Sequence, residues 1–110
     1  MRIPKGYNAV FVYGTLKNQQ KADDYSIKGR LFDIGHFPGI VLEEHKEIPG
    51  QIALVSDKRL ASLDRYEGVP NLYTREKTLA QPLNGAGGAV DVWVYQWAGN
   101  TDDYKEIDKW

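Results

Sequence analysis

The chain has 110 residues, of which 42% are hydrophobic and 12% aromatic, so it can form one folded domain with a single core and is too apolar to be disordered. Its net charge is −1, which argues against nucleic acid or an anionic membrane as the main partner. The absence of cysteine excludes disulfides, thiolate nucleophiles and cysteine-ligated metals. We therefore expect a single domain over residues 1–110.

The first half of the chain contains three expected strands. Residues 9–13 are β-branched or aromatic and stop at Gly14, which predicts a strand buried on both faces. Polar residues 17–25 are expected to hold a short helix. The apolar residues 27–34 predict a second strand, and residues 40–42, after a turn-rich stretch, predict a third, short one.

The middle of the chain combines a loop, a strand and a helix. Charged residues 43–47 predict a solvated loop or hairpin tip, and the Pro-Gly pair at 49–50 follows before the next strand. Residues 51–55 are apolar enough for a further strand. Residues 57–66 predict a helix, with Ser56 as its N-cap.

The last third of the chain predicts two more strands. They are expected over residues 72–79 and 90–95, with the glycine-rich loop 83–88 between them. The polar tail predicts a short helix that starts near Asn100 or Thr101. No apolar run is long enough to cross a bilayer, and no apolar segment follows the N-terminal charges as in a signal peptide, so we expect a cytoplasmic protein.

Several strands and one clear helix indicate an α+β protein. Two of the strands are apolar on both faces, which favours a sheet that curls round and closes with the helix laid against it. The order of the strands does not follow from the pattern of residues alone.

Glu67 is the most informative single residue because it stands at the end of the predicted helix. Gly68 and Pro70 are the stop signal for that helix, so the carboxylate faces the negative end of the helix dipole. Glu67 also follows Leu60 by seven residues and Leu63 by four, which points it to the apolar side. Both effects predict a raised pKa, and a half-buried glutamate of raised pKa is a candidate general base.

A second candidate site is the turn that follows the first strand, which we call the Gly14 loop. It consists of Tyr13, Gly14, Thr15 and Leu16. Glycine lets a backbone approach a ligand closely, and successive N–H groups can then hold a carboxylate or a developing oxyanion. Taken alone, this tetrapeptide is more often a simple turn.

Two separated motifs in this chain resemble the gamma-glutamylcyclotransferase-like family. They are Phe-Val-Tyr-Gly-Thr-Leu-Lys at residues 11–17 and Leu-Asp-Arg-Tyr-Glu-Gly-Val-Pro-Asn-Leu-Tyr-Thr-Arg at residues 63–75, and the strand at 92–95 falls where the family has its closing aromatic strand. The sequence most resembles the gamma-glutamylamine cyclotransferase and AIG2-like branch. The resemblance covers nearly the whole chain.

The resemblance implies a small mixed β-barrel with flanking short helices. It also implies cleavage of a gamma-glutamyl amide to 5-oxoproline and a free amine, without a cofactor or metal. Carried over to this sequence, Tyr13, Gly14, Thr15 and Leu16 would grip the gamma-glutamyl group and Glu67 would be the general acid/base. The expected partner is a small gamma-glutamyl compound, and a barrel of this size can work as a monomer.

This reaction needs a proton shuttle but no nucleophile from the protein, because the substrate's own α-amine attacks its γ-carbonyl. An α-ammonium has a pKa of about 8 and an ordinary glutamate about 4.3, a mismatch that costs roughly 5 kcal/mol. Enzymes raise catalytic glutamates to about 6–7 by burial, which removes more than half of that cost. Whether the Gly14 loop holds the substrate carboxylate or the oxyanion stays open at this point.

Simpler interpretations exist for each of these residues. Glu67 can be a surface residue paired with Arg65 or Arg75. Tyr13 and Tyr73 are candidates to line the pocket and hydrogen-bond the substrate, but an aromatic residue in a strand can equally belong to the core. Arg75 is expected to be a solvated charge rather than a ligand for a carboxylate. Residues without an expected role in catalysis or metal binding are His36, His45, Trp93 and Trp97.

Two other functions are open alternatives. The first is a non-catalytic module that binds a small acidic metabolite in the same barrel. The second is removal of a gamma-glutamyl group from a larger biosynthetic intermediate, or opening of a crosslink. Compared with the family that the sequence resembles, the polar stretch between Leu16 and Ile27 and the tail after Trp97 are short. We therefore expect the rim of the pocket to be open on the side of the leaving amine.

Overall fold

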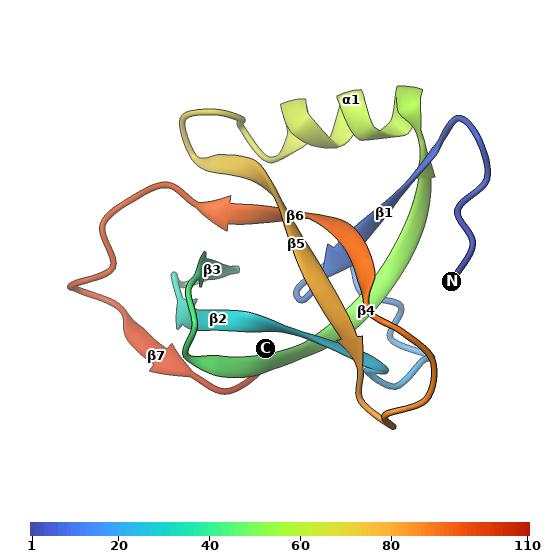
Figure 1. Cartoon of the computed structure of the whole chain (residues 1–110). Helices are drawn as coiled ribbons and strands as arrows, with labels where there is room; N and C mark the ends of the chain where they lie inside the picture. The colour runs from blue at the N-terminus through green and yellow to red at the C-terminus, as the bar shows by residue number, and fades with distance from the viewer.

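The computed structural model describes all residues from 1 to 110 and contains seven strands and one α-helix (Figure 1). The strands are β1 (Tyr7–Val12), β2 (Tyr25–Asp33), β3 (Pro38–Leu42), β4 (Lys46–Ser56), β5 (Tyr73–Pro82), β6 (Val90–Trp97) and β7 (Lys105–Ile107). The helix α1 (Asp57–Tyr66) lies between β4 and β5. The α+β class is confirmed, although the structure has one flanking helix rather than several. That helix is not long and apolar enough to span a membrane.

Five of the strands close into a barrel in the order β1, β4, β2, β3, β6 and back to β1. β6 runs parallel to both of its barrel neighbours, with Trp93 opposite Val10 of β1 and Gln96 opposite Ile40 of β3. The other pairings are antiparallel, and β5 and β7 extend the sheet along β6 and β2. The mixed barrel that the resemblance implied is therefore confirmed.

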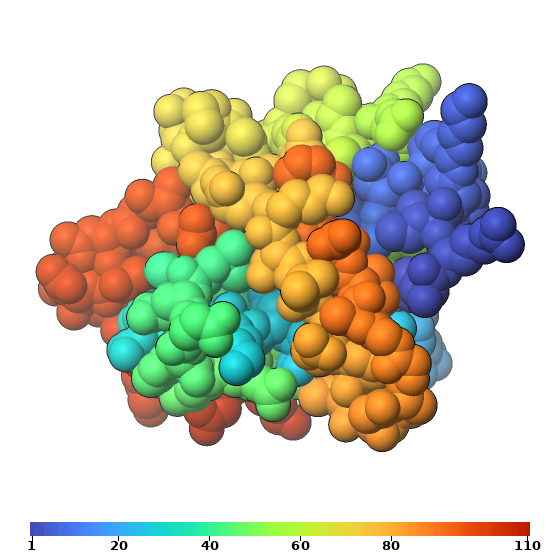
Figure 2. Space-filling model, in the orientation of Figure 1, coloured from blue at the N-terminus to red at the C-terminus, as the bar shows by residue number.

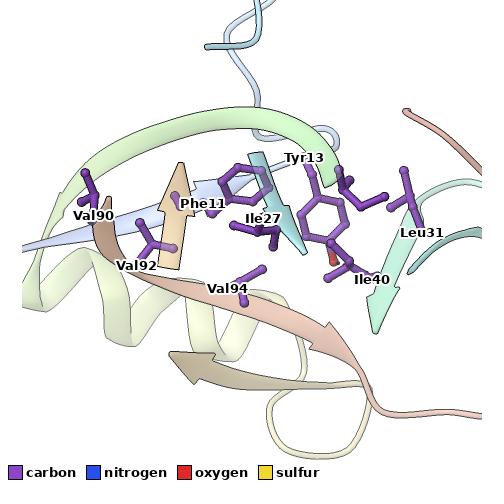
Figure 3. Close-up of a cluster of buried hydrophobic side chains, with 11 residues drawn as sticks. Phe11, Tyr13, Ile27, Leu31, Ile40, Val90, Val92 and Val94 are labelled. Atoms are coloured by element: carbon purple, nitrogen blue, oxygen red, sulfur yellow. Dashed lines mark hydrogen bonds between the residues drawn. The ribbon is translucent and has the colours of Figure 1, made fainter. Parts of the chain in front are cut away.

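The barrel interior is filled by apolar side chains from several strands (Figure 3). Alternate residues of β6 point inward because successive side chains of a strand face opposite sides. The labelled members of this cluster are Phe11, Tyr13, Ile27, Leu31, Ile40, Val90, Val92 and Val94.

A second apolar cluster lies between the barrel and α1, which crosses one side of the sheet in Figure 1. Leu60 and Leu63 are the buried residues of α1, and they pack with Val10, Val12 and Tyr95. The helix begins as predicted, because the Ser56 hydroxyl accepts a hydrogen bond from the Arg59 N–H at 3.1 Å. Burial of this face fixes α1 on the barrel, and its C-terminal end is fixed with it.

The predicted start of the strand at residue 51 is wrong, because β4 begins at Lys46 and the Pro-Gly pair at 49–50 lies inside it. β4 pairs with β2 through residue 50 and with β1 from Gln51 onward, so this is where the strand changes partner. A Cβ atom on Gly50 would lie 2.5 Å from the Phe11 ring, so glycine is needed there for close packing. At the Pro-Gly pair, β4 therefore continues without reversing and exchanges β2 for β1 as its partner strand.

The predicted helix over residues 17–25 is also wrong, because residues 17–24 form a turn and irregular backbone and Tyr25 begins β2. The buried side chain of Gln51 holds it in place: its oxygen accepts from the Asn18 N–H at 2.9 Å, and its amide donates to the Asn18 and Lys21 carbonyls. These bonds satisfy backbone groups that a helix would otherwise pair. A long-range contact has thus replaced the local helical pattern.

The tail departs from its prediction in the same way. Instead of a helix starting near Asn100 or Thr101, residues 101–104 form a turn, with a hydrogen bond from the Tyr104 N–H to the Thr101 carbonyl at 3.1 Å. The following residues form β7 on the edge of β2, where Ile107 lies opposite Leu31 and packs on the interior cluster. Pairing with an available strand edge outweighs the weak helical preference of a short polar segment.

Candidate active site

A cavity of about 190 Å³ lies between the end of β1 and the C-terminal end of α1. It brings together the Gly14 loop and Glu67, which are separated in the sequence by β2, β3 and β4. Its lining is mostly apolar or aromatic, and Glu67 is its one acidic or basic residue apart from tyrosines. The lining consists of Phe11, Val12, Tyr13, Gly14, Thr15, Leu16, Phe37, Pro38, Tyr66, Glu67, Leu72, Tyr73 and Tyr95.

Glu67 is the C-cap residue of α1 and is held by the hydrogen bonds that end the helix. Its own N–H donates to the Leu63 carbonyl at 2.8 Å, and the Gly68 N–H donates to the Arg65 carbonyl at 3.1 Å. The Val69 N–H then donates to the Asp64 carbonyl at 3.0 Å. This pattern is a Schellman motif, and Gly68 completes it with a φ of +66°, which glycine adopts without strain. The position of Glu67 is therefore fixed by the backbone.

The carboxyl group of Glu67 is half-buried and forms no ion pair. Arg75 Nε donates instead to Asp64 Oδ1 at 2.8 Å, and the Arg65 guanidinium lies 3.4 Å from the Ser62 hydroxyl. The interpretation of Glu67 as a paired surface residue is thus wrong. Burial raises the pKa of the Glu67 carboxyl above its ordinary value, as the sequence predicted. The contribution expected from the helix dipole stays a prediction.

The Gly14 loop reaches the cavity through a tight turn. The Gly14 carbonyl accepts a hydrogen bond from the Lys17 N–H at 3.0 Å. A Cβ atom on Gly14 would lie 2.7 Å from Cγ of Pro38, so the loop needs glycine in order to pack against the start of β3. The N–H groups of Thr15 and Leu16 donate to no acceptor within the chain. They are free to donate to an anionic ligand.

The two tyrosines predicted to contact substrate both line the cavity, but their hydroxyl groups bind the backbone. The Tyr13 hydroxyl donates to the Tyr95 carbonyl at 2.6 Å and accepts from the Ile40 N–H at 3.3 Å. The Tyr73 hydroxyl donates to the Pro38 carbonyl at 2.7 Å. These bonds connect the Gly14 loop to β3 and β6, and β5 to β3, around the site. The Tyr13 hydroxyl both donates and accepts within the chain, whereas the Tyr73 hydroxyl oxygen can still accept a hydrogen bond from a ligand.

Asp64 joins the helix to the strands next to the cavity. Its Oδ1 atom accepts from the Tyr95 hydroxyl at 2.7 Å and from Arg75 Nε at 2.8 Å. Arg75 also lies over the Trp93 ring, with 4.1 Å between the guanidinium carbon and the ring centroid. Arg75 is therefore neither a solvated charge nor a ligand for a substrate carboxylate. It is part of the structure that holds α1 against β5 and β6.

Seven residues that line the cavity were not predicted from the sequence: Phe11, Val12, Phe37, Pro38, Tyr66, Leu72 and Tyr95. Phe11 and Val12 belong to the first motif. Tyr66 and Leu72 flank the Glu67 turn, and the position of each inside the second motif was the available signal. Tyr95 faces the helix because it alternates with the inward-facing Val92 and Val94. Phe37 and Pro38 come from a turn-rich stretch with no local signal, and only the pairing of β3 with β6 brings them here.

The two histidines do not line this cavity. His36 is exposed, and His45 lies 3.4 Å from Glu106 at the edge formed by β7. No group of three or more His, Cys, Asp or Glu side chains is placed to hold a metal ion. What the cavity offers chemically is one carboxyl of raised pKa, free backbone N–H groups and an apolar wall.

The protein is a small closed β-barrel whose candidate active-site cavity contains a single carboxyl group and a glycine loop. The model of the family described as gamma-glutamyl cyclotransferase, AIG2-like, matches residues 10–110. The chain belongs to this family. The family and its named members support gamma-glutamyl cyclotransferase activity.

Two related proteins carry names that agree with this assignment. A Vibrio cholerae protein provisionally named a gamma-glutamylcyclotransferase is 34% identical over 99 residues, which cover 79% of this chain and 81% of the relative. A Rattus norvegicus gamma-glutamylaminecyclotransferase is 30% identical over 115 aligned positions, which cover 81% of this chain and 77% of the relative.

Solved structures share the fold. An AIG2-like protein from Mus musculus superposes with a TM-score of 0.77 at 22% identity, over 94% of this chain and 88% of the other. An Arabidopsis thaliana protein superposes with a TM-score of 0.73 at 23% identity, over 89% and 73% of the two chains. At these identities the likeness shows the fold alone.

Proposed function

We propose that this protein cleaves a gamma-glutamyl amine to 5-oxoproline and the free amine, with Glu67 as the general acid/base. The observation that carries the proposal is the placement of Glu67: a half-buried carboxyl without an ion pair, in an apolar cavity that it shares with the Gly14 loop. Family membership supports the reaction class.

The reaction is an acyl transfer within one molecule. The substrate's α-nitrogen forms a bond to its γ-carbonyl carbon, and the bond from that carbon to the leaving nitrogen breaks. One proton leaves the α-ammonium before attack, and the attacking nitrogen loses a second proton to solvent as the lactam forms. The leaving nitrogen takes up one proton as its bond to carbon breaks and a second from solvent as the free amine becomes an ammonium. No electrons are gained or lost, so the step requires no redox cofactor.

Glu67 can carry that proton in both directions. In its ionised form it accepts the proton from the α-ammonium, and the resulting carboxylic acid then donates to the departing amine. Burial favours this cycle because it raises the pKa of the Glu67 carboxyl, and the difference from the pKa of the amine becomes smaller. The carboxylate has no arginine partner that would hold it permanently ionised.

The Gly14 loop would hold an oxygen anion of the glutamyl group. The free N–H groups of Thr15 and Leu16 can bind either its α-carboxylate or the oxyanion that forms at the γ-carbonyl. The rings of Tyr13 and Tyr73 form apolar walls beside this loop. The loop and Glu67 would then contact different parts of the same small substrate.

Replacement of Glu67 tests this proposal. Glu67→Gln keeps the size of the side chain but cannot accept a proton, so we expect kcat for 5-oxoproline release to fall by about 10²–10⁴-fold. Glu76→Gln is the matched control, because Glu76 is exposed on β5 and does not line the cavity. Undiminished turnover in Glu67→Gln would contradict the assigned role.

The same assay separates the alternative functions. A binding module would be stabilised against heat by a gamma-glutamyl compound without releasing any 5-oxoproline over hours. An enzyme that acts on a larger biosynthetic intermediate would fail on small amides. In a cell extract analysed by mass spectrometry, it would still release 5-oxoproline from that intermediate.

A further inference from the structure

An ion pair lies one helical turn before Glu67. Arg75 Nε donates to Asp64 Oδ1 at 2.8 Å, and the two side chains are only 24% and 26% exposed. Asp64 precedes Glu67 by three residues, and the backbone of Glu67 is still helical, with φ −82° and ψ −2°. Residues three apart on a helix have Cβ atoms about 5–6 Å apart. The charges of this pair are therefore close enough to act on the Glu67 carboxyl.

The pair is held in place from several sides. The Tyr95 hydroxyl donates to the same Asp64 Oδ1 atom at 2.7 Å, and the guanidinium carbon of Arg75 lies 4.1 Å from the centroid of the Trp93 ring. The Val69 N–H donates to the Asp64 carbonyl at 3.0 Å, so the turn after α1 closes on the same residue. Figure 2 shows the atoms of α1 meeting those of β5 and β6 at the top of the view. The pair therefore lies at a formed junction between the helix and these two strands.

Either charge alone would change the ionisation of Glu67. A neighbouring carboxylate disfavours the charged form of a glutamate and raises its pKa, whereas a neighbouring guanidinium favours that form and lowers its pKa. Because Asp64 and Arg75 form a bonded pair, their charges act on Glu67 in opposite directions. Burial is the one cause of the raised pKa of Glu67, which agrees with such a balance.

The other titratable groups that line the cavity with Glu67 carry no charge in the range where a glutamate titrates. They are four tyrosines, one each from the Gly14 loop, α1, β5 and β6, and an ordinary tyrosine has a pKa of about 10. Burial raises the pKa of three of them further. These three are Tyr13, Tyr73 and Tyr95, and the fourth is the exposed Tyr66.

The basic residues next to the two parts of the site do not face Glu67. Lys17, which follows the Gly14 loop, pairs with Asp23 at 3.2 Å, and Arg65 lies outside the cavity. The ion pair one turn before Glu67 is therefore the charge that can act on it.

We infer from this junction that Asp64 and Arg75 are positioning residues of the proposed reaction, and that each cancels the charge of the other at Glu67. The pair thereby holds α1 on the strands and leaves Glu67 without a charged partner. The inference rests on the proposed cyclotransferase activity. It predicts opposite effects from removal of the two charges.

Titration of the Glu67 carboxyl by 13C NMR measures these effects directly, with Glu67→Gln to identify its signal. Asp64→Asn keeps the acceptor oxygen but leaves the arginine charge uncompensated, so the pKa of Glu67 should fall by at least about 0.5 units. Arg75→Gln leaves the aspartate charge uncompensated, so the pKa should rise by at least about 0.5 units. The double variant removes both charges and should return the pKa to within about 0.3 units of the unmodified protein.

Three further variants control for charge and for packing. Glu76→Gln and Lys77→Gln each remove one charge from an exposed position on β5, and solvent screening should keep the shift at Glu67 below about 0.2 units. Lys77 also lies over the Trp93 ring, at 4.6 Å, so its loss mimics the loss of that contact in Arg75→Gln. Arg75→Lys keeps the positive charge and should keep the pKa within about 0.3 units.

The pH dependence of kcat/KM connects this balance to the reaction. With γ-glutamyl-butylamide as substrate and 5-oxoproline release as the assay, the acid limb reports the pKa of the general base in the free enzyme. We expect the limb to move to lower pH in Asp64→Asn and to higher pH in Arg75→Gln. A merely structural role would lower turnover in both variants without moving the limb in opposite directions.

The outcomes distinguish this inference from the proposed function. Absent shifts, or shifts of the same sign, in folded Asp64→Asn and Arg75→Gln overturn the inference and leave the proposed function standing. Opposite shifts in the titration with an unmoved acid limb overturn it as well. Release of 5-oxoproline from neither the amide nor a cell extract contradicts the proposed function, and the inference falls with it.

Discussion

At the scale of single residues, the site depends on two positions whose chemistry is set by the backbone around them. Glu67 is directed into the cavity by the hydrogen bonds that end α1, so no charged partner is needed to place it. Gly14 is required because the Pro38 ring occupies the space that any side chain would need. Glu67 is thus placed by local hydrogen bonds of the backbone, whereas Gly14 is required by a packing contact with a residue distant in the sequence.

The buried carboxyl of Glu67 should reduce stability at neutral pH. Its pKa is raised in the folded protein, so folding is favoured when it is protonated, and that contribution is lost as the pH rises through the folded pKa. Glu67→Gln should therefore raise the melting temperature at pH 8, but give no gain at about pH 4, below the ordinary glutamate pKa. Thermal unfolding of Glu76→Gln at both pH values provides the control. An equal effect of Glu67→Gln at both pH values would contradict this prediction.

Gly14→Ala should destabilise the protein and impair the site. The new methyl group would overlap the Pro38 ring, and such overpacking costs about 1–3 kcal/mol in the free energy of unfolding. Gly88→Ala is the matched control, because no atom lies within 4 Å of a Cβ built there. Urea denaturation measures both changes, and equal stability of the two variants would refute the steric argument.

At the scale of elements, the cavity depends on how α1 is attached to β5 and β6. Apolar contacts from Leu60 and Leu63 bury one face of the helix. The bonds of Asp64 to Tyr95 and Arg75 add direction to this contact, because they hold the last turn of α1 against two particular strands. Glu67 follows one turn later and takes its place from this attachment.

Tyr95→Phe should weaken that attachment without changing the packing of the ring. It removes the 2.7 Å hydrogen bond to Asp64, and hydrogen bonds to charged groups contribute about 1.5–3 kcal/mol. Partial exposure of Asp64 reduces the expected loss to roughly 1–2 kcal/mol. Tyr7→Phe, at a tyrosine 49% exposed, should change the free energy of unfolding by less than about 0.5 kcal/mol. Equal losses in the two variants would show that the Asp64 bond is not stabilising.

At the scale of the whole molecule, the site exists because the sheet closes. β6 runs between β1 and β3, and this places the Gly14 loop, Pro38 and Tyr95 around one cavity. The closed barrel also leaves an interior filled by side chains, with Leu31 and Ile40 fully buried in it. Packing of this interior and the shape of the cavity are therefore linked.

Leu31→Ala should be among the most destabilising substitutions. Leu31 is 0% exposed, and removal of a buried leucine side chain costs about 2–5 kcal/mol, a large part of the stability of a small domain. Leu79→Ala is the control, because Leu79 is 52% exposed on β5. The midpoint of denaturant unfolding compares the two, and a loss below about 1 kcal/mol for Leu31→Ala would contradict the tight interior described above.

Sequence reasoning was accurate where neighbouring residues decide the structure. Alternation along residues 90–95 predicted the strand β6, and Ser56 and Gly68 predicted the limits of α1. It failed where a distant group intervened. The side chain of Gln51 holds residues 18–21 in a turn, and the free edge of β2 makes residues 105–107 of the tail a strand.

The sequence by itself determined the strands, the helix, the family motifs and the inward direction of Glu67, because hydrophobic periodicity and helix stop signals act over a few residues. Only the tertiary structure decided that β6 runs parallel to β1 and β3, that Arg75 pairs with Asp64 rather than Glu67, and that the tyrosine hydroxyls bind the backbone. These features depend on contacts between residues far apart in the chain. Closure of the barrel creates those contacts, and local patterns carry no information about them.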